Sequence, residues 1–174
     1  MGPLVFKLMS TGYATAMVTM IPWFLYHRQS VTIPIVKSFL EILRTENPGV
    51  KIGVAGFCWG GRYALLAGQK GFADAPLVDA VFAGHPSLVS IPSDIEEPVV
   101  PTSIAVGSSD TVFSSKMAEQ TRKLWADKYV KTEIAIYVGA KHGFCVRGNM
   151  NNKQEKQDMQ KAVEQVNPLM RFLI

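Results

Sequence analysis

Apolar positions along the chain follow two different spacings. Between residues 31 and 46 they recur every three or four positions opposite charged side chains, which predicts a helix over 31–46. Further helical spacing follows residue 61 and covers 114–129 and 152–174, with an interruption expected at Asn167–Pro168. Short apolar runs predict strands at 51–57, 78–84, 102–107 and 133–138. Since strands and helices alternate, we predict an α/β fold, a parallel sheet flanked by helices.

The beginning of the chain has a different pattern. Residues 3–26 are apolar and almost free of charge, with breaks near residues 10–12 and at Pro22. The uncharged stretch 13–26 is shorter than the ~20 residues that span a bilayer, so we expect no membrane partner. Two interpretations stay open for residues 1–30, an apolar helical cap over a pocket and helices packed on the sheet. We expect one domain, 1–174, with 31–174 as its main part.

Composition narrows the class of protein. The 174 residues are 48% hydrophobic, as in a globular domain with a real core. The net charge of +4 comes from scattered Lys and Arg, and no basic run is interleaved with aromatics, so no nucleic-acid partner is expected. Two cysteines, Cys58 and Cys145, are too few for a disulfide scaffold and lack zinc-ligand spacing. The cysteine usage favours a reducing, cytoplasmic location and no metal.

A candidate nucleophile lies where the strand at 51–57 meets the following helix. The residues around it read Gly56-Phe57-Cys58-Trp59-Gly60, which is the spacing of the G-x-S-x-G nucleophile elbow with a thiol in place of the hydroxyl. Small residues two before and two after the nucleophile let the strand and helix approach each other. The backbone N–H of Trp59 would face the attacked carbonyl and stabilise an oxyanion, while its ring is expected to pack.

Two further residues complete a candidate triad. Cys58, Asp110 and His142 each follow the end of a predicted strand, in the order nucleophile, acid, histidine that α/β-hydrolases use. His142 would take the thiol proton, and Asp110 would fix the tautomer of His142. The alternatives are a buried structural cysteine at 58 and a helix-capping aspartate at 110. His85 precedes the acid, which favours a site-lining or structural role over that of the base.

Other residues near the triad are candidates for contact with a substrate. Cys145 lies three residues after His142, where it would line a pocket. Arg62 and Arg147 are candidates to hold a substrate carboxylate, with a solvated surface arginine as the alternative for each.

With these motifs, the sequence resembles the dienelactone hydrolase family, and its fungal branch in particular. The resemblance runs from about residue 31 to the C-terminus and rests on Gly56–Gly61, His85-Pro86, Asp110 and His142-Gly143-Phe144. It implies an α/β-hydrolase fold, a Cys58–Asp110–His142 triad, and hydrolysis of a small lactone or ester without metal or cofactor. His85, Phe144 and Arg147 are the expected substrate-binding residues.

The resemblance fails at the beginning of the chain. Family members are longer and place several strands before this region, including a glutamate that contacts the nucleophile and a second oxyanion donor. The chain therefore resembles the C-terminal portion of a hydrolase and is expected to lack the first strands, leaving one edge of the 51–57 strand unpaired. We expect either a helix or another chain to cover that edge, and in the second case the chain forms a homo-oligomer through it. The expected lack of the first strands also leaves an alternative function, a catalytically weak or inactive shortened hydrolase that acts as a binding or oligomer-forming protein. Acyl transfer or thioester hydrolysis by the same triad is a third interpretation.

Overall fold

The computed structural model describes residue 18 and residues 20–171. By its internal contacts the chain divides into two compact units, residues 1–38 and residues 39–174, and each is described by itself. The division at residue 30 between a cap and the main part of one domain stays a prediction. The larger unit contains every strand of the described chain.

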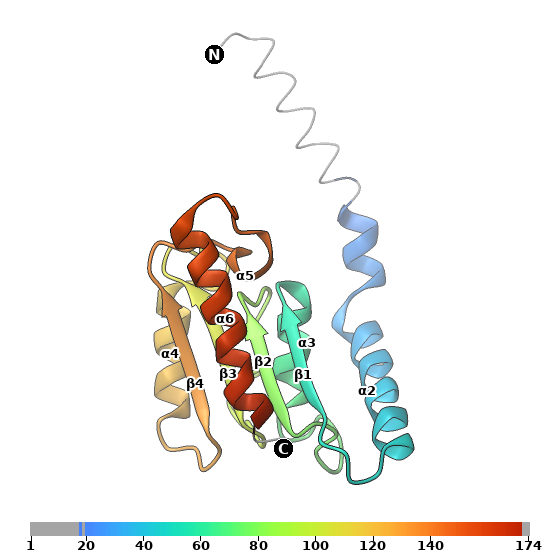
Figure 1. Cartoon of the computed structure of the whole chain (residues 1–174). Coiled ribbons are helices and arrows are strands. Elements are labelled where there is room, and N and C mark those ends of the chain that lie inside the picture. The colour runs from blue at the N-terminus through green and yellow to red at the C-terminus, as the bar shows by residue number, and fades with distance from the viewer. Residues whose placement is uncertain (1–17, 19, 172–174) are drawn as a thin grey trace. The chain divides into compact units, whose positions relative to one another are not determined.

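A parallel sheet of four strands forms the centre of the larger unit. The strands lie in the order β1-β2-β3-β4 (Figure 1). Their bounds are β1 Gly53–Phe57, β2 Ala80–Gly84, β3 Thr102–Gly107 and β4 Thr132–Tyr137. Every residue of β2 and β3 is buried, which explains why these two strands read as continuous apolar or small runs in the sequence. The predicted parallel sheet is confirmed.

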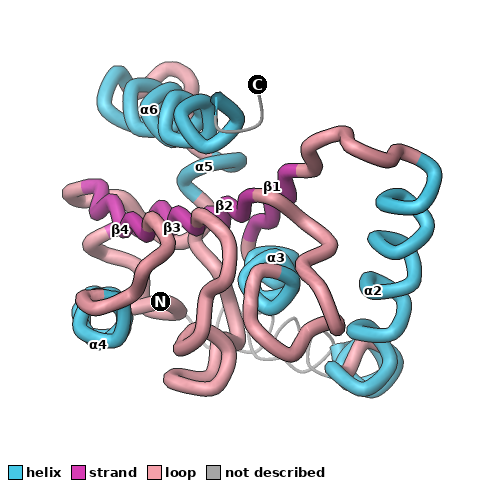
Figure 2. The backbone as a smooth tube through the Cα atoms, turned by 90° about the horizontal axis from the view of Figure 1, so that it is seen from below, coloured by secondary structure: helices cyan, strands magenta, loops and turns pink. Residues whose placement is uncertain are grey.

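Helices cover both faces of this sheet. Figure 2 shows α3 (Trp59–Ala67) and α4 (Ser115–Trp125) on one side, and α5 (Phe144–Arg147) and α6 (Lys153–Arg171) on the other. The hydroxyl of Ser114 caps α4 by accepting the Met117 N–H. The interruption predicted at Asn167–Pro168 does not occur, since the helical backbone continues to Arg171. Because proline has no N–H, Pro168 removes one backbone hydrogen bond from α6, which nevertheless stays helical there.

Strand β1 is an edge of the sheet. It pairs with β2 and with no other strand of the described chain, as the sequence predicts. Because all four strands are parallel, their carboxyl ends meet along one rim. The loops that leave this rim carry the candidate triad.

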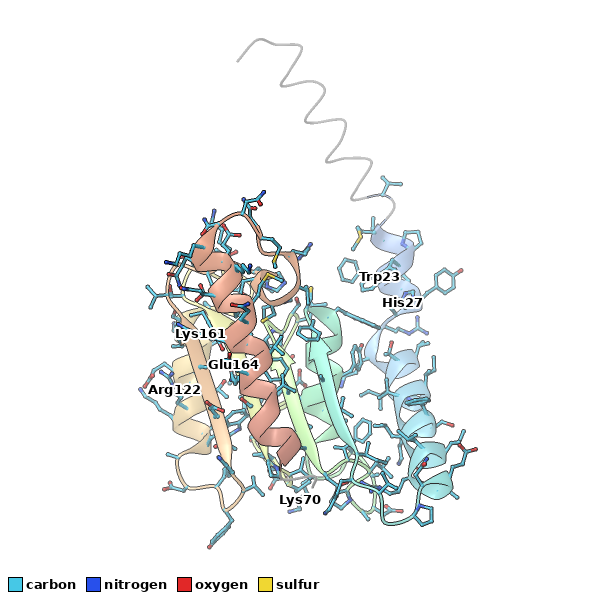
Figure 3. All side chains as sticks on the ribbon, viewed as in Figure 1. Trp23, His27, Lys70, Arg122, Lys161 and Glu164 are labelled. Atoms are coloured by element: carbon cyan, nitrogen blue, oxygen red, sulfur yellow. The ribbon has the colours of Figure 1, made fainter. Side chains whose placement is uncertain are left out.

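The smaller unit is described from residue 18 onward, except residue 19. It is helical over residues 20–26, turns at His27 and Arg28, and enters α2, Gln29–Glu46, which continues into the larger unit. The rings of Trp23 and His27 stack at a centroid distance of 4.9 Å (Figure 3). The rest of the helices expected over 3–26 lies outside the described residues. Within the described range, no helix combines the length and apolar character needed to cross a bilayer.

Candidate active site

The backbone at Cys58 adopts the strained turn expected of a nucleophile elbow. Cys58 has φ 51° and ψ −121° and stands between the end of β1 and the start of α3. A Cβ on Gly56 would overlap the carbonyl oxygen of Gly60 and lie 2.8 Å from the Cβ of Ala64. A Cβ on Gly60 would meet nothing within 4 Å. The close approach of strand and helix therefore requires glycine at position 56, and the second small residue is not a steric requirement.

The three predicted triad residues lie together at the rim. Nε2 of His142 is 3.3 Å from Sγ of Cys58, and Nδ1 of His142 is 2.9 Å from Oδ2 of Asp110. The Asp110 side chain is fully buried, and its Oδ1 accepts the backbone N–H groups of Val112 at 2.7 Å and Phe113 at 3.1 Å. The carboxylate is thus held by the backbone and presents its second oxygen to the imidazole.

A fourth side chain, Ser87, contacts both Sγ of Cys58 and Nε2 of His142. Its Oγ is 3.1 Å from Sγ of Cys58 and 3.3 Å from Nε2 of His142. Ser87 follows β2, so each of the four strands contributes one residue to this cluster. Ser87 was not among the residues predicted from the sequence. The strand-end rule that found Asp110 three residues after β3 could have found Ser87 three residues after β2.

The neighbours of the thiol change its acidity. Burial alone would raise the pKa of Cys58, but hydrogen bonds from Ser87, His142 and the Trp59 N–H, together with the positive charge of His142, lower it below its usual value. Burial alone would lower the pKa of His142, but its bonds to Cys58 and Asp110 raise it. Both shifts favour a thiolate–imidazolium pair, the reactive form of a cysteine nucleophile.

His85 does not line the site, contrary to its expected substrate-binding role. The side chain is fully buried behind His142, with ring centroids 5.0 Å apart, and is packed near Phe57 and Phe144. Neither ring nitrogen has a hydrogen-bond partner. Burial, with the nearby charge of His142, lowers the pKa of His85 to about 4. The ring is neutral near pH 7 and packs against the imidazole of His142.

This burial predicts a pH-dependent stability. A histidine that is neutral when folded and titrates at its ordinary value when unfolded binds protons preferentially in the unfolded state between pH 6.5 and about 4. The stabilisation from the buried neutral ring is fully present above pH 6.5. It is lost as the pH falls toward about 4, which lowers the free energy of unfolding by up to about 3 kcal/mol. We expect the free energy of unfolding in urea to drop less between these values in His85→Leu than in the wild type. Equal drops in both proteins would contradict the buried neutral ring.

The remaining predicted residues lie around a pocket next to His142. It has a volume of ≈ 320 Å³, and its lining includes Lys141, Phe144, Arg147, Glu155 and Asp158, but not Cys58. Phe144 lines this pocket, but the residue is buried and its side chain belongs to the hydrophobic core. Arg147 is exposed at this pocket, as expected of a residue that could meet a substrate.

Other predicted contacts have structural roles. Arg62 forms an ion pair with Asp94 at 2.8 Å and thereby anchors the loop after β2. The ring of Trp59 packs on Tyr63, with centroids 4.7 Å apart. Cys145 is buried in the core beside α6, where burial raises its pKa to about 12. Within the described residues, no group of three or more His, Cys, Asp or Glu side chains is arranged to hold a metal ion.

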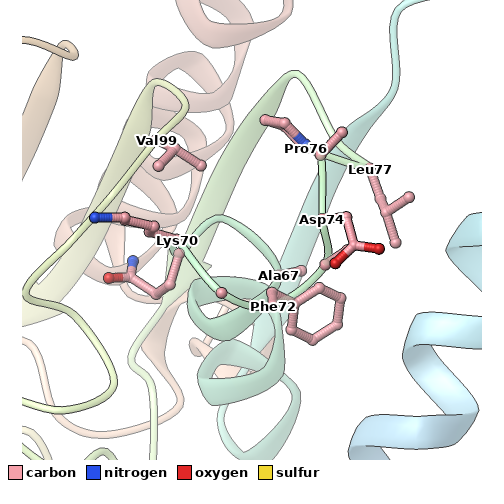
Figure 4. A pocket seen from close by; sticks show the side chains of 11 residues that line it. Ala67, Lys70, Phe72, Asp74, Pro76, Leu77 and Val99 are labelled. Atoms are coloured by element: carbon pink, nitrogen blue, oxygen red, sulfur yellow. The ribbon is translucent and has the colours of Figure 1, made fainter.

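A second hollow lies at the far end of α3. It has a volume of ≈ 130 Å³, and Lys70, Phe72, Asp74 and Leu77 are among its lining residues (Figure 4). None of the triad residues touches it. The pocket of ≈ 320 Å³, which His142 lines, therefore adjoins the triad, and this hollow does not.

The sequence matches the model of one protein family and several curated proteins. The family is the dienelactone hydrolase family, matched over residues 13–172. Hydrolase tropI of Talaromyces stipitatus is 28% identical over 142 residues, covering 80% of this chain and 52% of the relative. Dienlactone hydrolase 1 of Gibberella moniliformis is 26% identical over 106 residues, covering 61% of this chain and 39% of the relative. The chain thus spans about half the length, or less, of these relatives.

Solved structures share the fold. A putative dienelactone hydrolase from Klebsiella pneumoniae aligns with a TM-score of 0.56 and 24% identity, covering 77% of this chain and 58% of that one. An esterase from Thermogutta terrifontis with propionate bound aligns with a TM-score of 0.63 and 18% identity, covering 82% of this chain and 68% of the esterase. At these identities the likeness shows an α/β-hydrolase fold, in agreement with the sequence prediction.

Proposed function

The chain belongs to the dienelactone hydrolase family, and from this membership we propose that it cleaves a small lactone or carboxylic ester through Cys58, His142 and Asp110. The observation that carries the proposal is the continuous contact from Sγ through the imidazole to the carboxylate, with distances of 3.3 and 2.9 Å. A thiol, an imidazole and a buried carboxylate in this order are the parts of a covalent acyl-transfer mechanism.

The first half-reaction forms a thioester. The thiolate of Cys58 attacks the carbonyl carbon of the substrate, and the carbonyl π electrons move to oxygen. The N–H of Trp59 stabilises this oxyanion from the N-terminus of α3. His142, which holds the thiol proton as imidazolium, gives it to the leaving alkoxide as the carbon–oxygen bond breaks. Asp110 stabilises the imidazolium and keeps Nε2 directed at the reacting atoms.

The second half-reaction restores the enzyme. Neutral His142 takes a proton from water, and the resulting hydroxide attacks the thioester carbonyl. Collapse of the tetrahedral intermediate expels the sulfur as a thiolate and releases the carboxylic acid. For a lactone, the alcohol formed in the first half-reaction stays covalently joined to the acyl group, so the product is a single hydroxy acid.

Arg147 is proposed as the residue that orients a substrate carboxylate. Its side chain and His142 line the same pocket, and the planar guanidinium suits bidentate binding of a carboxylate. Glu155 and Asp158 line the pocket as well, and their negative charges would keep a substrate carboxylate away from them. This assignment favours substrates that carry a free carboxylate near the scissile bond.

Alkylation of Cys58 tests the proposed nucleophile. We expect iodoacetamide to label Cys58 near neutral pH at least about tenfold faster than free cysteine, because its lowered pKa populates the thiolate. Labelling should slow in His142→Ala, which removes the proton acceptor and the positive charge. The rate is measured by mass spectrometry of the intact protein, followed by peptide mapping.

The second cysteine supplies an internal control for this experiment. Cys145 is buried and its pKa is raised to about 12, so it should stay unlabelled in the folded protein. Labelling of Cys58 no faster than free cysteine, or equally fast in His142→Ala, would refute the proposed nucleophile.

The open edge of β1 favours a second candidate function. β1 has a strand partner on one side in the described sheet, so backbone N–H and C=O groups on its other side can pair with another chain. Under this proposal the chain is a weak or inactive hydrolase that forms a homo-oligomer through β1. Size-exclusion chromatography with turnover of aryl esters and lactones separates the two functions. A stable oligomer with a reactive thiol and no turnover supports the second, and a monomer that turns over a substrate supports the first.

A further inference from the structure

We propose that Ser87 is a positioning residue that holds the Cys58 thiolate and the His142 imidazolium in their reactive arrangement. This inference deepens the proposed function and rests on it. Its basis is a triangle of contacts, in which Oγ of Ser87 is 3.1 Å from Sγ and 3.3 Å from Nε2, while Sγ and Nε2 are 3.3 Å apart. Ser87 is 8% exposed, so little water competes for these bonds.

The hydrogen-bonding capacity of a hydroxyl fits this position. A thiolate only accepts hydrogen bonds, and an imidazolium only donates them, whereas a serine hydroxyl does both. Ser87 can therefore donate its hydrogen to Sγ and accept the Nε2–H of His142 at the same time. Bonds of this kind to charged partners are stronger than neutral ones, so the hydroxyl favours the ion pair over the neutral thiol and imidazole.

The backbone holds Ser87 in place independently of its hydroxyl. Its N–H donates to the carbonyl of Cys58 at 2.9 Å, which ties the loop after β2 directly to the elbow. In the described part of the chain, the three non-glycine residues with positive φ are Cys58, His85 and Leu88, at or next to this connection. Such strain persists where the surrounding structure enforces it, often at functional sites.

The same loop is anchored at its other end. The Asp94 carboxylate accepts the backbone N–H of Ser90 at 2.8 Å and pairs with Arg62 of α3 at 2.8 Å. The segment from Pro86 to Asp94 is thus fastened to the elbow at Ser87 and to α3 at Asp94. Removing only the Ser87 hydroxyl should leave both attachments intact.

Other charged groups near the pair must be considered when its titration is measured. Asp110, after β3, faces the far nitrogen of His142. His85, the first residue after β2, faces the ring of His142 and has a pKa lowered to about 4, while the charge of Arg147 on α5 reaches His85. None of these groups is changed by a substitution at Ser87, so a change in the thiol titration reports the loss of the hydroxyl.

The test compares the rate of Cys58 alkylation by iodoacetamide in the wild type, Ser87→Ala and the control Ser93→Ala. Ser93 is an exposed residue of the same loop, and its hydroxyl donates to the Ser90 carbonyl. At about pH 6 we expect Ser87→Ala to react about tenfold more slowly, because fewer molecules hold a thiolate. At about pH 9.5, where most thiols are ionised, the rates should agree within about twofold.

The two pH values separate a positioning role from a structural one. The proposal would be overturned if the alkylation rate of Ser87→Ala fell equally at both pH values. It would also be overturned if the alkylation rates of Ser87→Ala and the wild type agreed at every pH. A difference that appears in Ser93→Ala as well would also overturn it. The wild-type profile separately tests the proposed nucleophile, since a thiol that labels like free cysteine refutes that function whatever Ser87→Ala does.

Discussion

Cys58→Ala is expected to lower kcat for ester or lactone hydrolysis by about 10⁴-fold or more. The substitution removes the atom proposed to attack the substrate carbonyl, and it leaves His142 without a thiol to deprotonate. Cys58→Ser should recover little of this loss. A hydroxyl is far less acidic than a thiol, so the neighbours that lower the pKa of Cys58 cannot hold it ionised. Steady-state kinetics on an aryl ester measures the effect.

Cys145→Ala is the matched control for this prediction. It removes the other thiol of the chain, which lies in the core and outside the contacts of the triad. We expect its kcat to stay within about twofold of the wild type, with a loss of stability of about 1 kcal/mol from the small cavity. Turnover that survives Cys58→Ala, or is lost in Cys145→Ala, would place the nucleophile elsewhere.

Asp110→Asn is expected to reduce kcat by about 10³–10⁴-fold with the fold preserved. Oδ1 of Asp110 accepts two backbone N–H groups, from Val112 and Phe113, and an amide oxygen can replace it there. The amide nitrogen must then face Nδ1 of His142 and donate to it. This forces the proton onto Nε2, the nitrogen that faces the thiol, so the imidazole can no longer accept the thiol proton.

Two measurements check this prediction beyond the rate. Nitrogen NMR of the imidazole should show a proton on Nδ1 in the wild type and no proton on Nδ1 in Asp110→Asn. Asp110→Ala, which also removes the acceptor for the two N–H groups, should lose thermal stability as well as activity. Asp127→Asn, the same change at an exposed position, serves as the control and should be neutral. Near wild-type kcat in Asp110→Asn would show that another group orients His142.

The sequence was sufficient to predict the elements and most of the site. Apolar runs of strand length separated by helical spacing predicted all four strands of the described sheet to within about two residues at their ends, because buried parallel strands and amphipathic helices differ in period. Cys58, Asp110 and His142 were found because the ends of parallel strands share one rim. Their contacts follow from that arrangement, and their catalytic roles stay with the proposed experiments.

Residues after a strand end were harder to place. His85, the first residue after β2, was expected at the substrate, yet it is buried behind His142, and Ser87, two residues further, reaches the sulfur. A loop can turn either residue toward the rim, and the choice depends on backbone angles such as the positive φ of His85 and Leu88. Those angles are set by packing against the elbow, so the residue types along the loop do not reveal them.

By itself the sequence determined the α/β class, the elbow at Cys58 and the chemistry available at the strand ends, because periodicity and residue type are local properties of the chain. Only the tertiary structure decided that His85 is sealed in the interior and that Ser87 completes the contacts of the thiol. These features depend on which segments meet across the fold. Such contacts result from the packing of residues that lie far apart in the sequence, and no single stretch of the chain encodes them.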